Sequence, residues 1–194
     1  MARLAVFASG RGPNFAAIAI AMRGIPNHSL EFMLCDVEGA PVFQRARELG
    51  IPSHLARYAG RSRRAAERDM LSRARQHRVD LIALAGFMRL LTPFFLDAFK
   101  GPIINLHPSL LPKYPGVHGI EESYSSGDRE LGITIMRIDE GVDTGPAIMQ
   151  QSFARTGEES LGEIEAKIHA LEHAWYPRVL VELLDRIDAQ GGNA

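Results

Sequence analysis

Apolar runs and helical patterns alternate through the first half of the chain. The apolar runs, which are typical of strands buried on both faces of a sheet, lie at residues 4–8, 30–35, 81–85 and 103–104. Between them, apolar residues recur at spacings of three and four, as in amphipathic helices, at residues 14–22, 41–49 and 63–77. This β-α-β order predicts an α/β fold with a doubly wound, mostly parallel sheet.

The second half of the chain has a different pattern. Strand-like runs at 132–138 and 147–151 flank a turn-rich segment at 139–146, which predicts an antiparallel excursion around a loop. Ser160 and Glu163 match a capping box, and apolar residues at helical spacing follow it. We therefore expect a long amphipathic C-terminal helix that is kinked or restarted at Pro177.

The composition is that of a globular protein, because 46% of the 194 residues are hydrophobic. We expect residues 1–194 to form a single domain. The net charge of −1 argues against a nucleic-acid partner, although 19 of the 22 basic residues are arginine. Eight arginines between Arg57 and Arg78 favour a solvated helix face over a rim that attracts an anionic ligand.

Cys35 is the sole cysteine, so no internal disulfide can form and a buried structural thiol is expected. The N-terminus passes directly into a strand-like run and does not resemble a signal peptide. No apolar run approaches the length of a membrane span, so no membrane partner is expected. These features predict a cytoplasmic protein, and they leave open whether it forms a homo-oligomer.

Asn105 and His107 form the most informative pair of side chains. They lie two residues apart directly after the apolar run at 103–104, so on a strand both would leave the same face at its carboxyl end. An amide donor beside a titratable imidazole suits a carbonyl that becomes an oxyanion when a nucleophile adds to it. Taken alone, the pair fits a plain strand end followed by a turn better.

A glycine-containing loop, residues 9–14, joins the first predicted strand to the first helix. Backbone amides and the helix dipole can hold a phosphate at such a position. The loop is not a dinucleotide fingerprint, because Phe15 stands where the third glycine would be. From these residues alone, a tight turn and an anion site are equally good interpretations.

Three segments together resemble the folate-dependent formyltransferases: residues 85–91 (AGFMRLL), 105–116 (NLHPSLLPKYPG) and 139–146 (DEGVDTGP). The resemblance covers nearly the whole chain and implies a Rossmann-like formyltransferase fold. It also implies transfer of a formyl group from 10-formyltetrahydrofolate to a primary amine, with no metal. The catalytic group of the family carries over to Asn105, His107 and Asp143. Without the resemblance, Asp143 fits an ordinary turn aspartate.

The resemblance also implies two sets of binding residues. The folate would contact the chain at Arg63, Met88, Arg89, Leu90, Leu91, Asn105, Asp139, Glu140, Gly141, Val142 and Asp143. Arg63 would lie near the glutamate tail of the folate, and the remainder would hold the pterin largely by main chain. The amine substrate would contact Gly12, Pro13, Asn14 and Glu172. Core positions for Met88 and Leu90, and a solvent-facing Glu172, are the alternatives.

Two departures from the family pattern concern the amine acceptor. Pro13 stands where a serine amide usually helps to bind phosphate, and proline has no amide hydrogen. Met136 stands where the enzymes that formylate glycinamide ribonucleotide usually have histidine. The chain has no room for the additional domains of several relatives, so the resemblance points to glycinamide ribonucleotide formylation in purine biosynthesis. Formylation of another small amine, such as an amino-sugar nucleotide, and non-catalytic folate binding are the alternatives.

Overall fold

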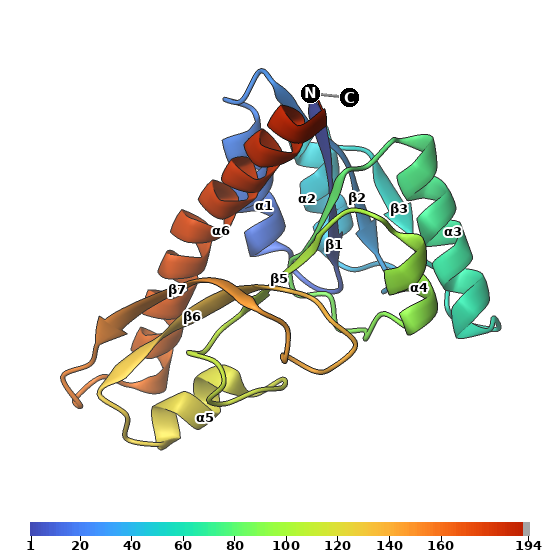
Figure 1. Ribbon diagram of the computed structural model, residues 1–194. Helices are drawn as coiled ribbons and strands as arrows, with labels where there is room; N and C mark the ends of the chain where they lie inside the picture. Colours follow the sequence, from blue (N-terminus) through green and yellow to red (C-terminus); the bar gives the residue numbers. More distant parts are fainter. Residues whose placement is uncertain (192–194) are drawn as a thin grey trace.

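The computed structural model describes residues 1–191 and is built on one seven-stranded sheet (Figure 1). The strands, in chain order, are β1 (Ala2–Ala8), β2 (His28–Cys35), β3 (Ser53–Leu55), β4 (Leu81–Leu84), β5 (Ile103–His107), β6 (Glu130–Arg137) and β7 (Ala147–Ala154). They pair in the order β3-β2-β1-β4-β5-β6-β7. The first five strands are parallel, β6 pairs antiparallel with β5, and β7 pairs antiparallel with β6. The predicted sheet and its antiparallel excursion are therefore confirmed.

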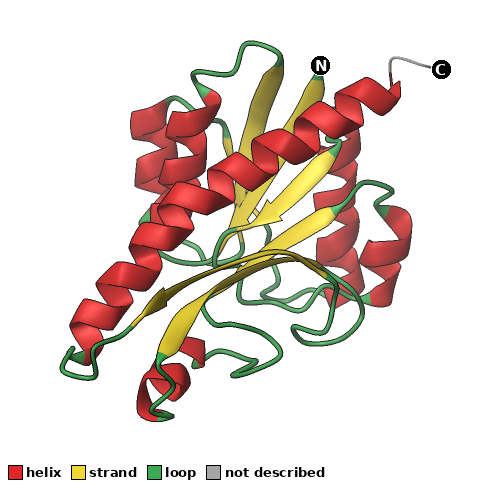
Figure 2. Ribbon diagram, turned by 60° about the vertical axis from the view of Figure 1, so that its left-hand side comes forward, coloured by secondary structure: helices red, strands yellow, loops and turns green. Residues whose placement is uncertain are grey.

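Helices cover both faces of this sheet. They are α1 (Pro13–Met22), α2 (Val42–Leu49), α3 (Arg63–Gln76), α4 (Pro93–Ala98), α5 (Gly119–Ser125) and α6 (Leu161–Gly191). One hydrophobic cluster joins α1, α2 and α6 to one face, and a second joins α3 and α4 to the other. Figure 2 shows α6 crossing the first of these faces diagonally.

The long helix α6 begins as the sequence predicts, but it does not restart at Pro177. Glu163 accepts from the backbone amide of Ser160 at 2.8 Å, and the Ser160 hydroxyl lies 3.4 Å from the Glu163 amide, which confirms the capping box. The helix then runs unbroken from Leu161 to Gly191. Buried apolar residues on both sides of Pro177 hold it against the sheet, and this packing offsets the lost hydrogen bond.

Three short elements were not predicted: β3, α4 and α5. Each has three to seven residues, which is too short to display a hydrophobic period. Strand β5 is also longer than predicted, because Asn105 and His107 continue its ladder after the apolar run ends. Asn105 and His107 therefore lie within a paired strand, whereas Asp143 lies in the loop between β6 and β7.

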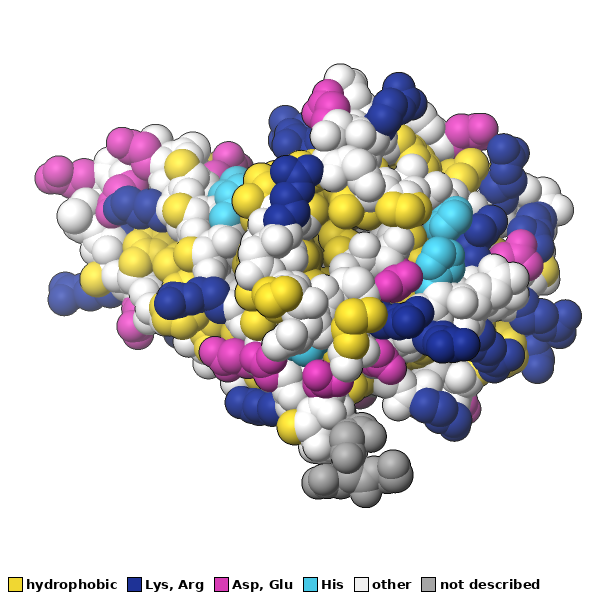
Figure 3. Space-filling model, turned by 90° about the horizontal axis from the view of Figure 1, so that it is seen from above, with side chains coloured by type: hydrophobic (Ala, Val, Ile, Leu, Met, Phe, Trp, Pro, Cys, Tyr) yellow, Lys and Arg dark blue, Asp and Glu magenta, His cyan; other side chains and the backbone are white. Residues whose placement is uncertain are grey.

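The surface and the single thiol agree with the sequence-based expectations. Cys35 is fully buried, and this burial raises the pKa of its thiol. The arginines between Arg57 and Arg78 are exposed, with the exception of the half-buried Arg73. Figure 3 shows basic side chains gathered at its right, the side on which Figure 1 places α3. Within residues 1–191, none of the helices combines the length and the hydropathy needed to cross a bilayer.

The topology brings the predicted site segments to one edge of the sheet. Strand order reverses between β1 and β4, and ligands of open α/β sheets bind at the carboxyl ends of strands beside such a reversal. The segments 9–14 and 85–91 leave β1 and β4 at this edge, and β5 ends there with His107. Strand β6 leads away from it, since Thr134 pairs with His107 and Arg137 with Ile104. The loop after β6 must therefore double back to reach the site.

Candidate functional site

Asn105 and His107 are held by strand pairing on both sides of β5. Asn105 lies opposite Leu84 of β4 and Met136 of β6, and His107 lies opposite Thr134. The two side chains share one face of the strand because they are two residues apart. His107 is 3% exposed, whereas Asn105 is half-buried. This rigid strand therefore presents an amide and a nearly buried imidazole side by side.

The ring of His107 has a different partner at each nitrogen. Nε2 lies 2.8 Å from the carbonyl oxygen of Tyr114, and Nδ1 lies 3.4 Å from Oδ2 of Asp143. A carbonyl oxygen can only accept a hydrogen bond, so Nε2 must carry a proton. The loop after β6 thus brings Asp143 to His107, as the resemblance implies.

Asp143 is held in place by main-chain contacts of two loops. Its Oδ2 accepts a hydrogen bond of 2.9 Å from the amide of Gly116, and its own backbone has a positive φ of 53°. Within the same loop, Asp139 accepts from the Gly141 amide at 2.9 Å and from the Thr144 hydroxyl at 2.8 Å. These contacts shape the loop that carries Asp143 back to the end of β5.

Large apolar side chains are exposed on the two loops expected to hold the folate. Met88 is 68% exposed and Leu90 is 57% exposed in the loop after β4, and Val142 is 49% exposed in the loop after β6. Leu91 packs against the hydrophobic cluster of α3 and α4. The alternative that Met88 and Leu90 are core residues is therefore wrong, and both remain accessible to a ligand.

A buried carboxylate fixes the loop after β4, and the sequence analysis did not identify it. Asp36 accepts a hydrogen bond of 2.6 Å from Nε of Arg89 and a second bond from the hydroxyl of Ser9. The same hydroxyl accepts from the amide of Met88 at 2.9 Å. The Nε group of Arg89 thus helps to fix the loop, while its side chain stays 39% exposed. Asp36 directly follows the end of β2, and this position after a buried strand could have identified it as a candidate site residue.

The Arg89 guanidinium packs on the ring of Tyr58, and the charge of Arg63 also acts on Tyr58. The guanidinium carbon is 4.1 Å from the centre of the Tyr58 ring. Burial raises the pKa of Tyr58 to about 12, while the positive charges of Arg89 and Arg63 act in the opposite direction. Arg63 is exposed at the first residue of α3. The charge of Arg63 therefore acts on Tyr58, which contacts Arg89 in the loop after β4.

The first loop passes into α1 through Gly12. Its φ of 69° is left-handed, and an added Cβ would collide with the side chain of Val42, so only glycine fits. Pro13 occupies the start of the helix, where a backbone amide has no partner within the helix. The loop therefore keeps its shape at Pro13 but offers one donor fewer.

Asn14, at the start of α1, meets Glu172, which lies within the first half of α6. The Asn14 side-chain nitrogen donates to Oε2 of Glu172 at 3.0 Å. Glu172 is 5% exposed, so the alternative of a solvent-facing glutamate is wrong. The oxygen Oδ1 of Asn14 is buried without a hydrogen-bond partner. A buried unpaired acceptor beside a buried carboxylate suits a ligand that brings hydroxyl donors.

His169 is a neighbour of this pair that the sequence analysis missed. Its Nδ1 lies 2.9 Å from Oε2 of Glu172, one helical turn away. This hydrogen bond is the main cause that raises the pKa of His169, while burial and the positive charge of Arg11 lower it. The spacing of three residues between a histidine and a glutamate was the available signal.

The His169–Glu172 pair predicts a pH-dependent contribution to stability. Because the folded pKa of His169 is raised, this contribution is complete below the unfolded pKa and is lost as pH rises through the folded one. We expect His169→Gln to lower the free energy of unfolding at pH 6 by at most about 1 kcal/mol, and by less at pH 9. Urea unfolding of both proteins at each pH measures this difference. An equal loss at both values would contradict the prediction.

The described residues carry no clear metal site. Among residues 1–191, no group of three or more His, Cys, Asp or Glu side chains is arranged to hold a metal ion.

Comparison with known proteins gives consistent results. Residues 2–180 match the formyl transferase family. The chain is 42% identical over 186 residues to phosphoribosylglycinamide formyltransferase of Bacillus subtilis (strain 168), covering 95% of each chain. It is 35% identical over 179 residues to the enzyme of the same name from Escherichia coli (strain K12), covering 91% of this chain and 84% of that one. The solved structure of glycinamide ribonucleotide transformylase 1 from Geobacillus kaustophilus is 42% identical, with a TM-score of 0.89, and the match covers 95% of this chain and 99% of that one.

Proposed function

Because this chain belongs to the formyl transferase family, we propose that it transfers a formyl group from 10-formyltetrahydrofolate to the amine of glycinamide ribonucleotide, a step of purine biosynthesis. The observation that carries this proposal is the approach of Asp143 to His107 beside Asn105, at the strand end where the fold places ligands. Relatives of nearly equal length that bear the name of this activity support the choice of acceptor.

The reaction begins when the amine nitrogen attacks the formyl carbon, and the formyl oxygen becomes negatively charged. The Asn105 amide and a protonated His107 stabilise this oxyanion. Nε2 of His107 is bound to the Tyr114 carbonyl, so the donor to the oxyanion is Nδ1, which also faces Asp143 at 3.4 Å. The Asp143 carboxylate stabilises the positive charge on the ring and receives the proton of the amine through water. That proton passes to the folate nitrogen as its bond to the formyl carbon breaks.

We propose that the folate binds against the loops that follow β4 and β6. Exposed Met88 and Leu90 offer apolar contacts to a flat ring system, and the polar edge of the pterin would pair with main-chain groups of residues 88–91 and 139–143. Arg63 lies at the start of α3, where its charge can meet the carboxylates of the glutamate tail.

The acceptor would lie across the first loop, with its phosphate at the start of α1. Gly12 and Asn14 supply backbone amides there, and the helix dipole favours an anion. Glu172 and the unpaired Oδ1 of Asn14 are acceptors for the ribose hydroxyls. His169 adds a donor and, when protonated, a positive charge beside them.

A substrate panel tests the proposed function. The protein is incubated with 10-formyltetrahydrofolate and either glycinamide ribonucleotide or an amino-sugar nucleotide, and both the folate product and the formylated amine are measured. Formylation of glycinamide ribonucleotide alone supports the proposal. Turnover with the amino-sugar nucleotide alone would show that this amine, and not glycinamide ribonucleotide, is the acceptor. Folate binding without turnover on either amine would indicate a non-catalytic protein.

Pro13 offers a test of the phosphate position. We expect Pro13→Ser to tighten glycinamide ribonucleotide about tenfold, because it restores a charge-assisted hydrogen bond worth roughly 1.5–3 kcal/mol. Calorimetric titration measures the affinity, with free phosphate as a competitor. Pro93→Ser is the matched control, since Pro93 also stands at the start of a helix but outside the first loop. Unchanged affinity in Pro13→Ser would mean that the phosphate does not use this amide.

The proposal extends to the compartment. A single cysteine that is fully buried agrees with a reducing environment, and we place the protein in the cytoplasm on this ground. Cell fractionation with an antibody against the protein tests this placement, which does not affect the assignment of the reaction.

A further inference from the structure

The two groups that contact His107 both come from non-glycine residues with a left-handed backbone. Tyr114, with φ 56°, turns its carbonyl toward Nε2, and Asp143, with φ 53°, turns its carboxylate toward Nδ1. Such conformations are strained for residues other than glycine and persist only where other contacts hold them. Gly116 holds Asp143. Tyr114 is held by a hydrogen bond from its side chain to Asp128.

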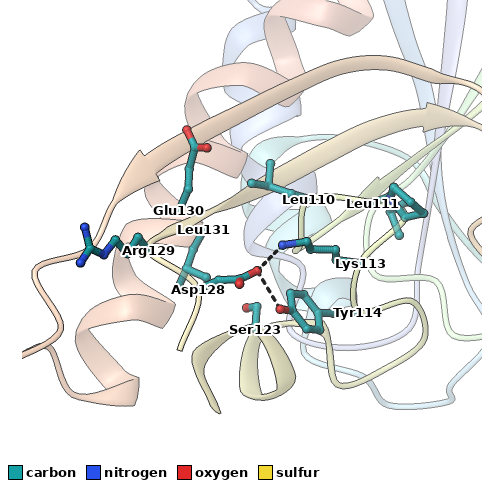
Figure 4. Close-up of a pocket in the computed structure, with 10 residues that line it drawn as sticks. Leu110, Leu111, Lys113, Tyr114, Ser123, Asp128, Arg129, Glu130 and Leu131 are labelled. Carbon is teal, nitrogen blue, oxygen red and sulfur yellow. Dashed lines mark hydrogen bonds and ion pairs between the residues drawn. The ribbon is translucent and has the colours of Figure 1, made fainter. Parts of the chain in front are cut away.

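The Tyr114 side chain lies in a hollow between its own loop and residues 128–131. Its hydroxyl donates to Oδ2 of Asp128 at 2.8 Å, and the ammonium of Lys113 donates to the same oxygen at 2.7 Å (Figure 4). The hollow has a volume of about 450 Å³ and is lined by residues 110–114, 123 and 128–131. The hydrogen bonds from Lys113 and Tyr114 lower the pKa of Asp128, so the carboxylate stays charged and accepts both donors.

A second set of bonds ties the loop to β6 beneath Tyr114. The hydroxyl of Ser109, which is 1% exposed, donates to the Lys113 carbonyl at 2.7 Å and also lies 3.2 Å from the Tyr114 carbonyl. The Ser109 carbonyl accepts from the fully buried Thr134 hydroxyl at 2.7 Å, and that hydroxyl accepts from the Leu111 amide at 3.0 Å. The Tyr114 carbonyl therefore has a second contact besides His107, and within residues 1–191 the bond to Asp128 is the one polar contact of the Tyr114 side chain.

We propose that Tyr114 and Asp128 are positioning residues for the reaction, an inference that rests on the role proposed for His107. The bond in the hollow keeps Tyr114 in its left-handed conformation, and this holds its carbonyl at Nε2. The carbonyl in turn keeps the proton on Nε2 and sets the angle of the ring. Without the anchor, Tyr114 relaxes toward the right-handed region, and the ring loses its fixed orientation toward the reacting carbon.

Tyr114→Phe tests the anchor because it removes only the hydroxyl and keeps the ring. We expect kcat to fall about ten- to a hundredfold, as for a small misplacement of a reacting group, while both KM values stay within about twofold. Nitrogen-15 NMR of the histidine rings gives a second reading that needs no turnover. In the unmodified protein at high pH His107 should be held as the Nε2–H tautomer, and in Tyr114→Phe the two tautomers should mix.

Lys113→Met is the matched control, since it removes the other donor to the same Asp128 oxygen and leaves Tyr114 in place. It should retain kcat and the His107 tautomer. Asp128→Ala should reproduce the effect of Tyr114→Phe, and combining the two changes should cost nothing further. Unchanged kcat and tautomer in Tyr114→Phe, or an equal loss in Lys113→Met, would overturn the proposal. If the unmodified protein formylates neither amine, the proposed function fails, while the tautomer measurement still decides the anchoring.

Discussion

Replacing His107 with alanine is expected to leave a folded protein that turns over on the order of 100- to 1,000-fold more slowly. The imidazole is nearly buried at the end of β5, and in the proposed mechanism it donates a hydrogen bond to the developing oxyanion. Asn105 and substrate binding remain in the variant, so some turnover should persist. Steady-state kinetics with both substrates at saturation measure this loss.

His77→Ala is a suitable control for the His107 experiment. His77 ends α3, and its carbonyl accepts from the side chain of Arg3 at the start of β1, at the amino edge of the sheet. This control should keep its turnover. A folded His107→Ala protein, with an unchanged unfolding midpoint and near-normal turnover, would remove His107 from the catalytic group.

Replacing Asp143 with asparagine is expected to lower turnover by about 100-fold, the usual scale for a group that takes part in proton transfer. Asparagine keeps the shape of the side chain and an oxygen that can accept from the Gly116 amide, so the loop should hold. It removes the negative charge that lies 3.4 Å from Nδ1 of His107. The expected loss is therefore electrostatic and chemical, and the KM values should change little.

A double-mutant cycle separates this role from a purely structural one. If Asp143 acts through His107, the variant with both substitutions should be scarcely slower than His107→Ala alone, because residues that act as a unit are not additive. Losses that multiply would mean that the two residues work independently. Full activity in Asp143→Asn would reduce Asp143 to a turn residue that shapes the loop.

Much of the sheet could be predicted because burial restricts which residue types occur within each short segment of the sequence. Strands buried on both faces must be apolar throughout, and helices that cover a sheet must be apolar on one side, so both patterns are readable over a few residues. Among the elements that were missed, α4 has six residues and α5 has seven, which is too short to display a hydrophobic period. The restart expected at Pro177 does not occur, and the core contacts that hold α6 on both sides of it lie far away in the chain.

The sequence by itself determined the strand and helix order, and it placed Asn105 and His107 together because they are neighbours on one strand. The resemblance of three motifs added Asp143 and the expected ligands. Only the tertiary structure decided which other side chains meet. Asn14 and Glu172 are separated by 158 positions, and Ser9 and Asp36 by 27. No local pattern encodes such contacts, because they depend on the register of the sheet and on the paths of loops held by long-range hydrogen bonds.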